Sequence, residues 1–305
     1  MLSIVTTVYK SESYLREFLA QIGFALEELA CQQFELIFVL DGITDHSKEL
    51  LLDRQRQIPQ IKIVELSRNF GHHQAISAGL SYSSGDLVFL IDCDLEVSPG
   101  VLVDFMSLME TTEADVIYGV QHRRKGGFVE RTFGGMFWKL FNYLSDTKIP
   151  INTVTERLMR KSYVDALLSM RDRNLFFAGM MHWIGFEQIP CRVNKGQREG
   201  KSTYTLRRRM DLLIEAVTSF SAKPLKLLFQ FGLFIFLVSV VLAALFVFRK
   251  LIYPETVLVG FTSIIVLMLF GIGSILSALG LVGIYISRIF NQVKDRPLYW
   301  VKNVY

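Results

Sequence analysis

The sequence predicts an α/β fold with a doubly wound, Rossmann-like sheet, followed by a membrane hairpin. Short apolar runs alternate with helix-length polar stretches through the first part of the chain, as in folds that alternate strand and helix. Two carboxylates one residue apart, Asp92 and Asp94, follow one of these runs, and two long charge-free apolar runs occupy the last third of the 305 residues. We therefore expect a ligand-binding domain held at a membrane.

The first strand, Leu2–Val8, starts directly after Met1, with no basic region or cleavable apolar segment before it. The chain is therefore not expected to open with a signal peptide. Further strands are expected at Glu35–Leu40, Lys62–Leu66, Leu87–Ile91, Asp115–Tyr118 and, later, Trp183–Cys191. Helices are expected near Ser13–Ala30, Ser47–Gln57, His73–Ser81, Gly100–Glu110 and Gly135–Ser145.

Two membrane spans are expected at Leu227–Phe248 and Thr256–Ser287, because neither run carries a charge and each exceeds the roughly 20 residues that cross a bilayer. Lys and Arg flank both outer ends and are fewer in the short connector, which favours a cytosolic N-terminal domain and tail. We expect a catalytic domain over residues 1–206, an amphipathic juxtamembrane helix over 207–224, and the hairpin with its tail over 225–305. The protein is thus expected in a membrane, with a bacterial inner membrane as the setting.

Composition excludes several other classes. The net charge of +4 is modest and weighted toward the juxtamembrane region, which suits anionic lipid headgroups and gives no support to nucleic-acid binding. Three separated cysteines make neither a disulfide framework nor a zinc site. This usage fits a reducing cytosol.

The segment Asp92-Cys93-Asp94, with Glu96 close behind, is the strongest chemical signal. A buried strand that ends in paired carboxylates delivers them to the edge of the sheet where α/β proteins bind ligands. Hard oxygen ligands there suit Mg²⁺ or Mn²⁺ held jointly by protein and a diphosphate. We expect Asp92, Asp94 and Glu96 to form the metal site.

Several motifs in order along the chain carry a resemblance to a known family. They are Thr7-Val8-Tyr9, Asp41-Gly42, Leu66-Ser67-Arg68-Asn69-Phe70-Gly71, Asp92-Cys93-Asp94-Leu95-Glu96 and Arg198-Glu199-Gly200-Lys201-Ser202. The chain resembles the inverting, GT-A-fold glycosyltransferases of family 2, and among them the polyprenyl-phosphate enzymes such as dolichol-phosphate-mannose synthases and bactoprenol glucosyltransferases. The resemblance covers almost the whole chain, including the two spans.

The resemblance implies roles for particular residues. Asp94 would hold the metal under the donor's diphosphate, Asp92 would lie against the nucleotide, and Glu96 would complete the metal shell. Thr7, Tyr9, Asp41 and Arg68 would contribute to binding the nucleotide-sugar donor, a UDP-sugar in the first instance. Arg198 and Lys201 match the lid over the donor phosphates, with a solvated loop as the alternative. Arg123 and Arg131 lie where the family carries arginines toward the lipid phosphate, with a basic face for anionic lipid as the alternative.

The chain departs from the family pattern at three places. Leu40 replaces an acidic residue expected near the nucleotide, and the segment Thr7-Val8-Tyr9-Lys10-Ser11 lacks another acidic contact that the family pattern carries. Thr155 stands where the family has its proposed base. Glu156, one residue further, is a candidate for that role. A base is not essential, because a phosphate acceptor is mostly ionised near neutral pH, its second pKa being about 6.

These observations predict a metal-dependent hexosyltransferase that moves one sugar from a nucleotide donor to polyprenyl phosphate at the cytosolic membrane face. Two alternatives remain: a membrane-anchored nucleotide-sugar-binding protein that has lost catalysis, and a polysaccharide synthase, whose Gln-x-x-Arg-Trp element is absent from the sequence. A homo-oligomer is expected from the resemblance, with glycines such as Gly271 and Gly280 allowing close helix packing. His72 and His73 are interpreted as ordinary residues at the start of a helix.

Overall fold

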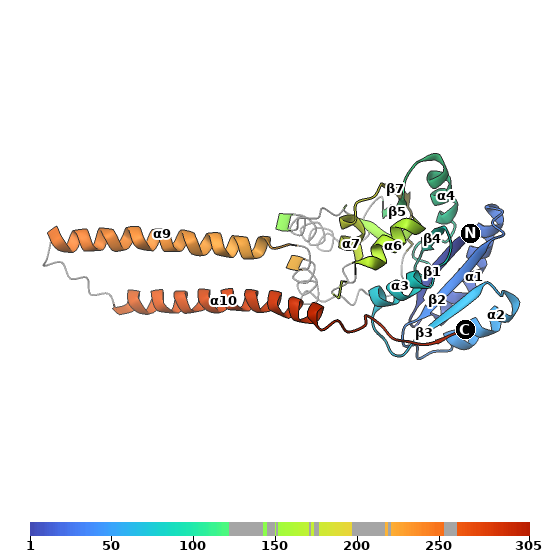
Figure 1. The fold of residues 1–305 in the computed structure, drawn as a ribbon, viewed down its shortest axis with the longest axis horizontal. Helices are drawn as coiled ribbons and strands as arrows, with labels where there is room; N and C mark the ends of the chain where they lie inside the picture. The colour runs from blue at the N-terminus through green and yellow to red at the C-terminus, as the bar shows by residue number, and fades with distance from the viewer. Residues whose placement is uncertain are drawn as a thin grey trace.

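The computed structural model centres on a mixed eight-stranded sheet with helices on both faces (Figure 1). It describes residues 1–121, 143–144, 150, 152–170, 172–173, 177–196, 217–218, 221–252 and 261–305. The strand order is β7-β5-β6-β4-β1-β2-β3-β8. The strands are β1 (Leu2–Val8), β2 (Phe34–Leu40), β3 (Ile61–Leu66), β4 (Leu87–Leu90), β5 (Val116–Gln121), β6 (Thr153–Arg160), β7 (Gln188–Val193) and β8 (Val301–Val304).

Parallel pairing joins β4, β1, β2 and β3 in the centre of the sheet, and it also joins β5 to β7. Two strands run against this direction. β6 lies antiparallel between β4 and β5, and β8 lies antiparallel on the outer edge of β3. The central strands are buried on both faces, which explains why they are read in the sequence as nearly continuous apolar runs.

Each face of the sheet has its own helices and its own apolar core. On one face, α1 (Glu12–Glu28), α2 (Ser47–Gln57) and α4 (Val101–Thr111) cover a core that includes Phe18, Phe38 and Phe105. On the other face, α3 (His72–Ser81), α6 (Lys161–Ser169) and α7 (Phe177–Trp183) cover a second core. Aromatic edge-to-face contacts, such as Phe18 with Phe38, fix the first core.

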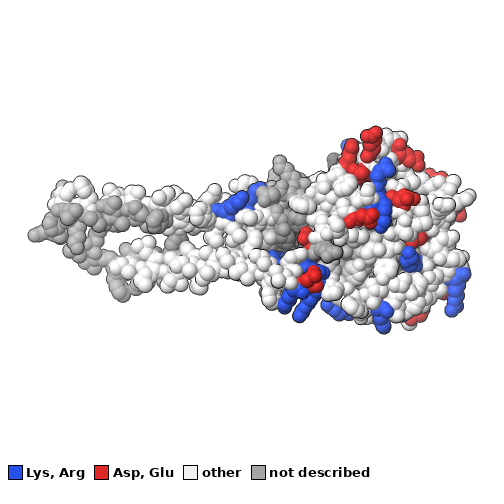
Figure 2. Space-filling view, viewed as in Figure 1, with Lys and Arg blue, Asp and Glu red and all other residues white. Residues whose placement is uncertain are grey.

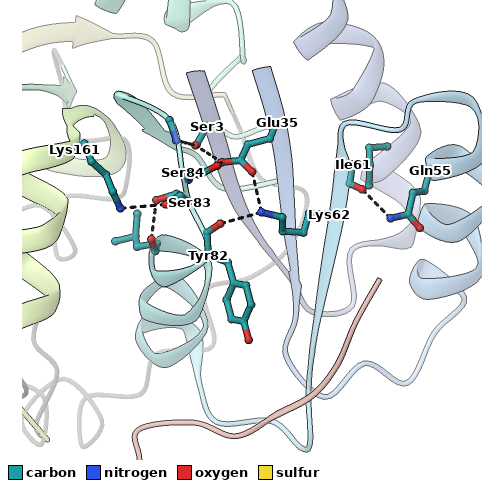
Figure 3. A network of polar contacts seen from close by, with 11 residues as sticks. Ser3, Glu35, Gln55, Ile61, Lys62, Tyr82, Ser83, Ser84 and Lys161 are labelled. Carbon is teal, nitrogen blue, oxygen red and sulfur yellow. Dashed lines mark hydrogen bonds and ion pairs between the residues drawn. The ribbon is translucent and has the colours of Figure 1, made fainter. Parts of the chain in front are cut away.

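A buried carboxylate ties the amino-terminal ends of the strands together (Figure 3). Glu35 accepts hydrogen bonds from the Ser3 hydroxyl at 2.5 Å, from the backbone N–H and the hydroxyl of Ser84, and from Lys62 Nζ at 2.9 Å. Burial alone would raise the pKa of Glu35, but these donors outweigh it and lower the pKa to about 2. This network lies at the sheet end opposite Asp92 and is therefore structural.

Two long helices project from the sheet domain as an antiparallel pair, α9 (Lys223–Ile252) and α10 (Phe261–Val293) (Figure 1). Many large apolar side chains on them are exposed, Phe229 at 70% and Leu267 at 69% among them. In Figure 2 the charges gather on the sheet domain and at the base of the pair. Within the described residues, the stretch Gly271–Val293 is long and apolar enough to cross a membrane. Two spans and their orientation remain a prediction.

After α10 the chain returns to the sheet domain, where its last residues form β8. Backbone hydrogen bonds link Ile63 and Tyr305 in both directions, and the Ser67 N–H donates to the Trp300 carbonyl at 2.9 Å. The Glu65 carboxylate accepts hydrogen bonds from Asn303, from the Tyr305 hydroxyl and from Lys48. Burial would raise the pKa of Glu65, and these donors lower it to about 2. The chain therefore leaves the sheet domain through α9 and returns to pair with the same sheet after α10.

The sequence prediction of the fold is confirmed for the first five strands and the four helices between them, within one to three residues at each end. The doubly wound sheet is corrected to a mixed sheet, because β6 and β8 are antiparallel. The expected strand at Trp183–Cys191 is corrected as well: α7 ends at Trp183 and β7 begins at Gln188. The tail that the sequence assigned to the membrane hairpin contributes β8. Most of the expected helix at Gly135–Ser145 and most of 207–224 lie outside the described residues.

Candidate active site

The site lies at the carboxyl end of the central strands, where β1, β4, β6 and the start of α3 meet. The chain leaves β4 through Ile91, whose N–H donates to the Val5 carbonyl at 3.1 Å. The next residues, Asp92 to Glu96, form a turn with Leu95 at a φ of 58°. The buried Cys93 thiol donates to the Thr7 carbonyl at 3.1 Å and so fixes this turn against β1. The two acidic side chains on either side of Cys93 are only partly buried.

Asp92 faces His72, which the sequence analysis interpreted as an ordinary residue at the start of a helix. His72 Nε2 lies 3.6 Å from Asp92 Oδ1, and His72 Nδ1 lies 3.2 Å from the Thr7 hydroxyl. The imidazole therefore bridges the end of β1 and the acidic turn after β4. The signal in the sequence was its position directly after Asn69-Phe70-Gly71, at the first residue of a helix.

Asp94 and Glu96 shape the acidic turn from within. The Glu96 N–H donates to Asp94 Oδ1 at 3.1 Å, and the Glu96 carboxylate forms an ion pair with Lys195. The chain after β7 is also held at this turn. The Gly196 N–H donates to the Glu96 carbonyl at 2.6 Å, and the backbones of Lys195 and Val97 pair in an isolated antiparallel β-bridge. Glu96, expected as a metal ligand, is thus engaged by a lysine.

Glu156 lies on β6, next to the acidic turn, and is only 3% exposed. Its Oε2 has no hydrogen-bond partner among the described residues. Burial, and then the negative charge of Asp92, raise the pKa of Glu156 to about 8. The carboxyl group therefore carries a proton at neutral pH in the metal-free protein, which does not suit the role of a base. Thr155, the position aligned with the family base, is half-buried.

Asp41 performs a structural task. It is 3% exposed, and its two carboxylate oxygens accept hydrogen bonds from the N–H groups of Phe70 at 2.7 Å and Gly71 at 3.0 Å. The Asn69 side chain donates back to the Asp41 carbonyl at 3.0 Å. A Cβ on Gly42, whose φ is +63°, would lie 2.2 Å from the Asn69 nitrogen, so only glycine allows this approach. The segments Asp41-Gly42 and Asn69-Phe70-Gly71 thus form one hydrogen-bonded unit, here called the clamp. His72 follows the clamp directly in the chain and is placed at the site by it.

Arg157, beside Glu156 on β6, points to the opposite face of the sheet. Its guanidinium lies over the Tyr118 ring at 5.8 Å, and Tyr118 makes an edge contact with the His182 ring. Arg157 Nε and Nη1 and His182 Nε2 are buried without a hydrogen-bond partner in the part of the chain that the structure describes. Burial, and then the charge of Arg157, lower the pKa of His182 to about 4. This cluster was not expected from the sequence.

The remaining predicted residues are distributed differently. Tyr9 is 47% exposed and lies under the Lys10 ammonium, which is 5.4 Å from the ring centroid. Arg68 is exposed and stacks on Phe70 at 4.1 Å. The predicted lid and acceptor cations, Arg198, Lys201, Arg123 and Arg131, lie outside the described residues.

The carboxylate oxygens of the acidic turn are suitable ligands for a divalent cation. In the described residues, no group of three or more His, Cys, Asp or Glu side chains is arranged to hold a metal ion by itself. Asp92 and Asp94, however, are partly exposed oxygen donors at the ligand-binding edge of the sheet. Burial raises the pKa of Glu156 beside them, and the negative charges of Asp92 and Asp94 raise it further. A hard cation that also binds phosphate oxygens suits two such carboxylates.

The mixed α/β sheet with an acidic turn at its carboxyl edge fits the GT-A class of nucleotide-sugar-binding domains. Comparison with protein families agrees: the model described as glycosyl transferase family 2 matches residues 3–168. The chain belongs to this family. The matched segment contains the clamp, the acidic turn and Glu156.

Individual relatives and solved structures are similar as well. A Mycobacterium tuberculosis (strain CDC 1551 / Oshkosh) protein named among glycosyltransferases is 39% identical over 305 residues, covering 100% of this chain and 88% of its own. The SfII prophage-derived bactoprenol glucosyl transferase of Shigella flexneri is 30% identical, covering 99% and 97%. Among solved structures, S. aureus TarS residues 1–349 in complex with UDP-GlcNAc matches with a TM-score of 0.49 at 17% identity, over 72% of this chain and 65% of that one.

Proposed function

We propose that this family 2 glycosyltransferase moves one sugar from a nucleotide-sugar donor to polyprenyl phosphate at the membrane surface, with inversion at the sugar. The observation that carries the proposal is one chain that combines two features. One is an acidic turn at the ligand-binding edge of a nucleotide-sugar fold, and the other is a pair of apolar helices whose base lies beside that domain. The name of the S. flexneri relative, a bactoprenol glucosyl transferase, supports a lipid carrier as acceptor.

The chemistry requires little of the protein beyond placement and charge. An oxygen of the acceptor phosphate attacks the anomeric carbon, the bond from that carbon to the donor diphosphate breaks, and the nucleoside diphosphate leaves. Because the acceptor phosphate is mostly ionised at neutral pH, no side chain has to remove a proton. A protonated Glu156 and a threonine at position 155 are compatible with this reaction.

Asp92 and Asp94 would hold a Mg²⁺ or Mn²⁺ ion, which when bound would offset charge on the departing diphosphate. Thr7, which lies beside His72, would contact the donor together with Tyr9 and Arg68. Arg198 and Lys201 follow shortly after Gly196, which is bonded to the acidic turn, and this supports their role as cations over the diphosphate. Arg123 and Arg131 would bind the acceptor phosphate.

The exposed apolar surface of α9 and α10 supports membrane anchoring, because soluble monomers rarely expose continuous apolar patches of this kind. A cytosolic sheet domain, two spans and a homo-oligomer complete the proposal. The return of the tail to β3 supports a hairpin that begins and ends on one side of the bilayer.

The test uses the full-length protein in detergent or lipid nanodiscs, with a panel of nucleotide sugars, Mn²⁺ or Mg²⁺ and a short polyprenyl phosphate. Mass spectrometry of the lipid identifies the product. We expect Asp94→Asn to abolish transfer without lowering the melting temperature, whereas Asp53→Asn, on the exposed side of α2, retains full activity. Normal metal-dependent transfer by Asp94→Asn would refute the proposed site.

A binding protein without turnover is the second candidate, and Thr155 together with the protonated Glu156 is the observation that favours it. That candidate predicts metal-dependent protection of the protein by nucleotide, with no lipid product from any donor in the panel.

A further inference from the structure

His72 occupies a position that neither the nucleotide-binding motifs nor the metal site explains. It is the first residue of α3, and its side chain is 46% exposed at the mouth of the site. Its two ring nitrogens face two different groups, the Thr7 hydroxyl at 3.2 Å and Asp92 Oδ1 at 3.6 Å. A polar partner at each nitrogen restricts the orientation of an imidazole.

Several contacts of the preceding residues fix the position of the His72 ring. The Asp41 carboxylate binds the N–H groups of Phe70 and Gly71, and Gly71 then takes a φ of 111° that turns the chain into α3. A side chain at position 71 would meet Gln74 Oε1 at 2.9 Å. The next residue, His73, points elsewhere, with its ring 5.6 Å from the Phe177 ring. The His72 ring, by contrast, faces Thr7 and Asp92.

We propose that His72 is a positioning residue that, together with Thr7, holds the Asp92 carboxylate in the orientation that binds a divalent cation and the donor diphosphate. In this role Nδ1 would accept a hydrogen bond from the Thr7 hydroxyl, and the Nε2–H group would face Asp92 Oδ1. One Asp92 oxygen would then face the imidazole, and the other would be left for the ligand. This inference rests on the proposed function, because it assigns His72 a role within the same site.

Partners in the outer shell of a metal site orient the ligands, and their loss typically weakens metal binding about 10- to 100-fold. We expect His72→Ala to weaken Mn²⁺ binding to the full-length protein within that range, both alone and in the presence of UDP. His72→Gln, which keeps a donor near Asp92, should restore part of the affinity. His73→Gln is the matched control on the same turn of helix, and it should bind Mn²⁺ within about twofold of the wild type, because the His73 ring lies against Phe177.

Binding is measured from the free-Mn²⁺ signal in electron paramagnetic resonance, which needs no turnover. Transfer assays add a second readout: His72→Ala should raise the Mn²⁺ concentration needed for half-maximal rate, with kcat largely recovered at saturating Mn²⁺. Thr7→Val should produce a smaller defect in the same direction, and the double variant should be less than additive because both changes act on one arrangement.

Two results would overturn the inference while leaving the proposed function intact. One is unchanged Mn²⁺ affinity in His72→Ala alongside a normal transfer rate, and the other is a kcat loss that saturating Mn²⁺ does not restore. By contrast, wild-type protein that binds no Mn²⁺, or Asp94→Asn that still binds it normally, would overturn the metal site itself and the inference with it.

Discussion

Glu156→Gln should stabilise the metal-free protein, and the gain should depend on pH. Glu156 is 3% exposed, and its pKa is raised from 4.5 to about 8, first by burial and then by Asp92. A raised pKa means that the folded state binds this proton more tightly than the unfolded chain does. In the wild type, the contribution of this proton to folding stability is complete below pH 4.5 and is lost as the pH rises toward 8. Glutamine keeps the shape of the neutral acid and has no proton to lose.

The size of the effect follows from the value of one pKa unit, about 1.4 kcal/mol. At pH 7 the unfolded chain gains up to about 3 kcal/mol from ionising a carboxyl that the fold keeps protonated, and local relaxation reduces this to roughly 2 kcal/mol. For a domain of this size that corresponds to a rise of about 4 to 8 °C in melting temperature.

The assay is thermal unfolding of the full-length wild type and Glu156→Gln in detergent with EDTA, followed by tryptophan fluorescence at pH 5 and pH 8. We expect a difference close to zero at pH 5 and a clear gain for the variant at pH 8. An equal difference at both pH values would show that Glu156 is not held protonated by the fold. Adding Mn²⁺ should narrow the gap at pH 8, because a cation beside Asp92 and Asp94 favours ionised Glu156.

Three further predictions concern the frame around the site. Glu35→Gln should lower the free energy of unfolding by about 2 kcal/mol at neutral pH, and the wild type should lose this contribution as the pH falls from 4.5 toward 2 in chemical denaturation. Glu65→Gln should cost about 1 to 2 kcal/mol by loosening β8 and should increase hydrogen exchange along Ile61–Leu66; unchanged exchange there would contradict the docked tail. Gly42→Ala should destabilise the protein by about 1 to 3 kcal/mol and weaken Mn²⁺ binding as His72→Ala does, because the added Cβ displaces the clamp that places His72.

The sequence predicted the central part of the sheet well because burial on both faces produces continuous apolar runs. β2, for example, is buried from Glu35 to Leu40. β6 escaped prediction for the opposite reason. Two of its buried residues, Glu156 and Arg157, are charged types, and such residues normally mark exposed segments. A four-residue strand such as β8, which pairs with β3 across more than two hundred residues of chain, has no local signal at all.

The same contrast holds in the site. Asp92 and Asp94 could be placed because a strand followed by acids has one geometric outcome. Asp41 was expected at the nucleotide, which stays a prediction; its hydrogen bonds with Phe70 and Gly71 could not be foreseen, since a motif does not reveal whether its carboxylate faces outward or into a neighbouring turn. His72 was missed because its partners, Thr7 and Asp92, come from two other strands, and only the folded sheet brings them together.

The negative charge of the site explains why a nucleotide-sugar donor would need accompanying cations to bind. Asp92, Asp94, Glu96 and Glu156 gather at one edge, and Lys195 is the lysine paired with Glu96 there. A donor diphosphate would bring more negative charge to a place where the fold already keeps one carboxyl protonated. Electrostatics therefore favours binding only when cations arrive together with the donor, namely a divalent ion on the acidic turn and the predicted lid residues Arg198 and Lys201. Donor affinity should accordingly rise steeply with Mn²⁺ concentration.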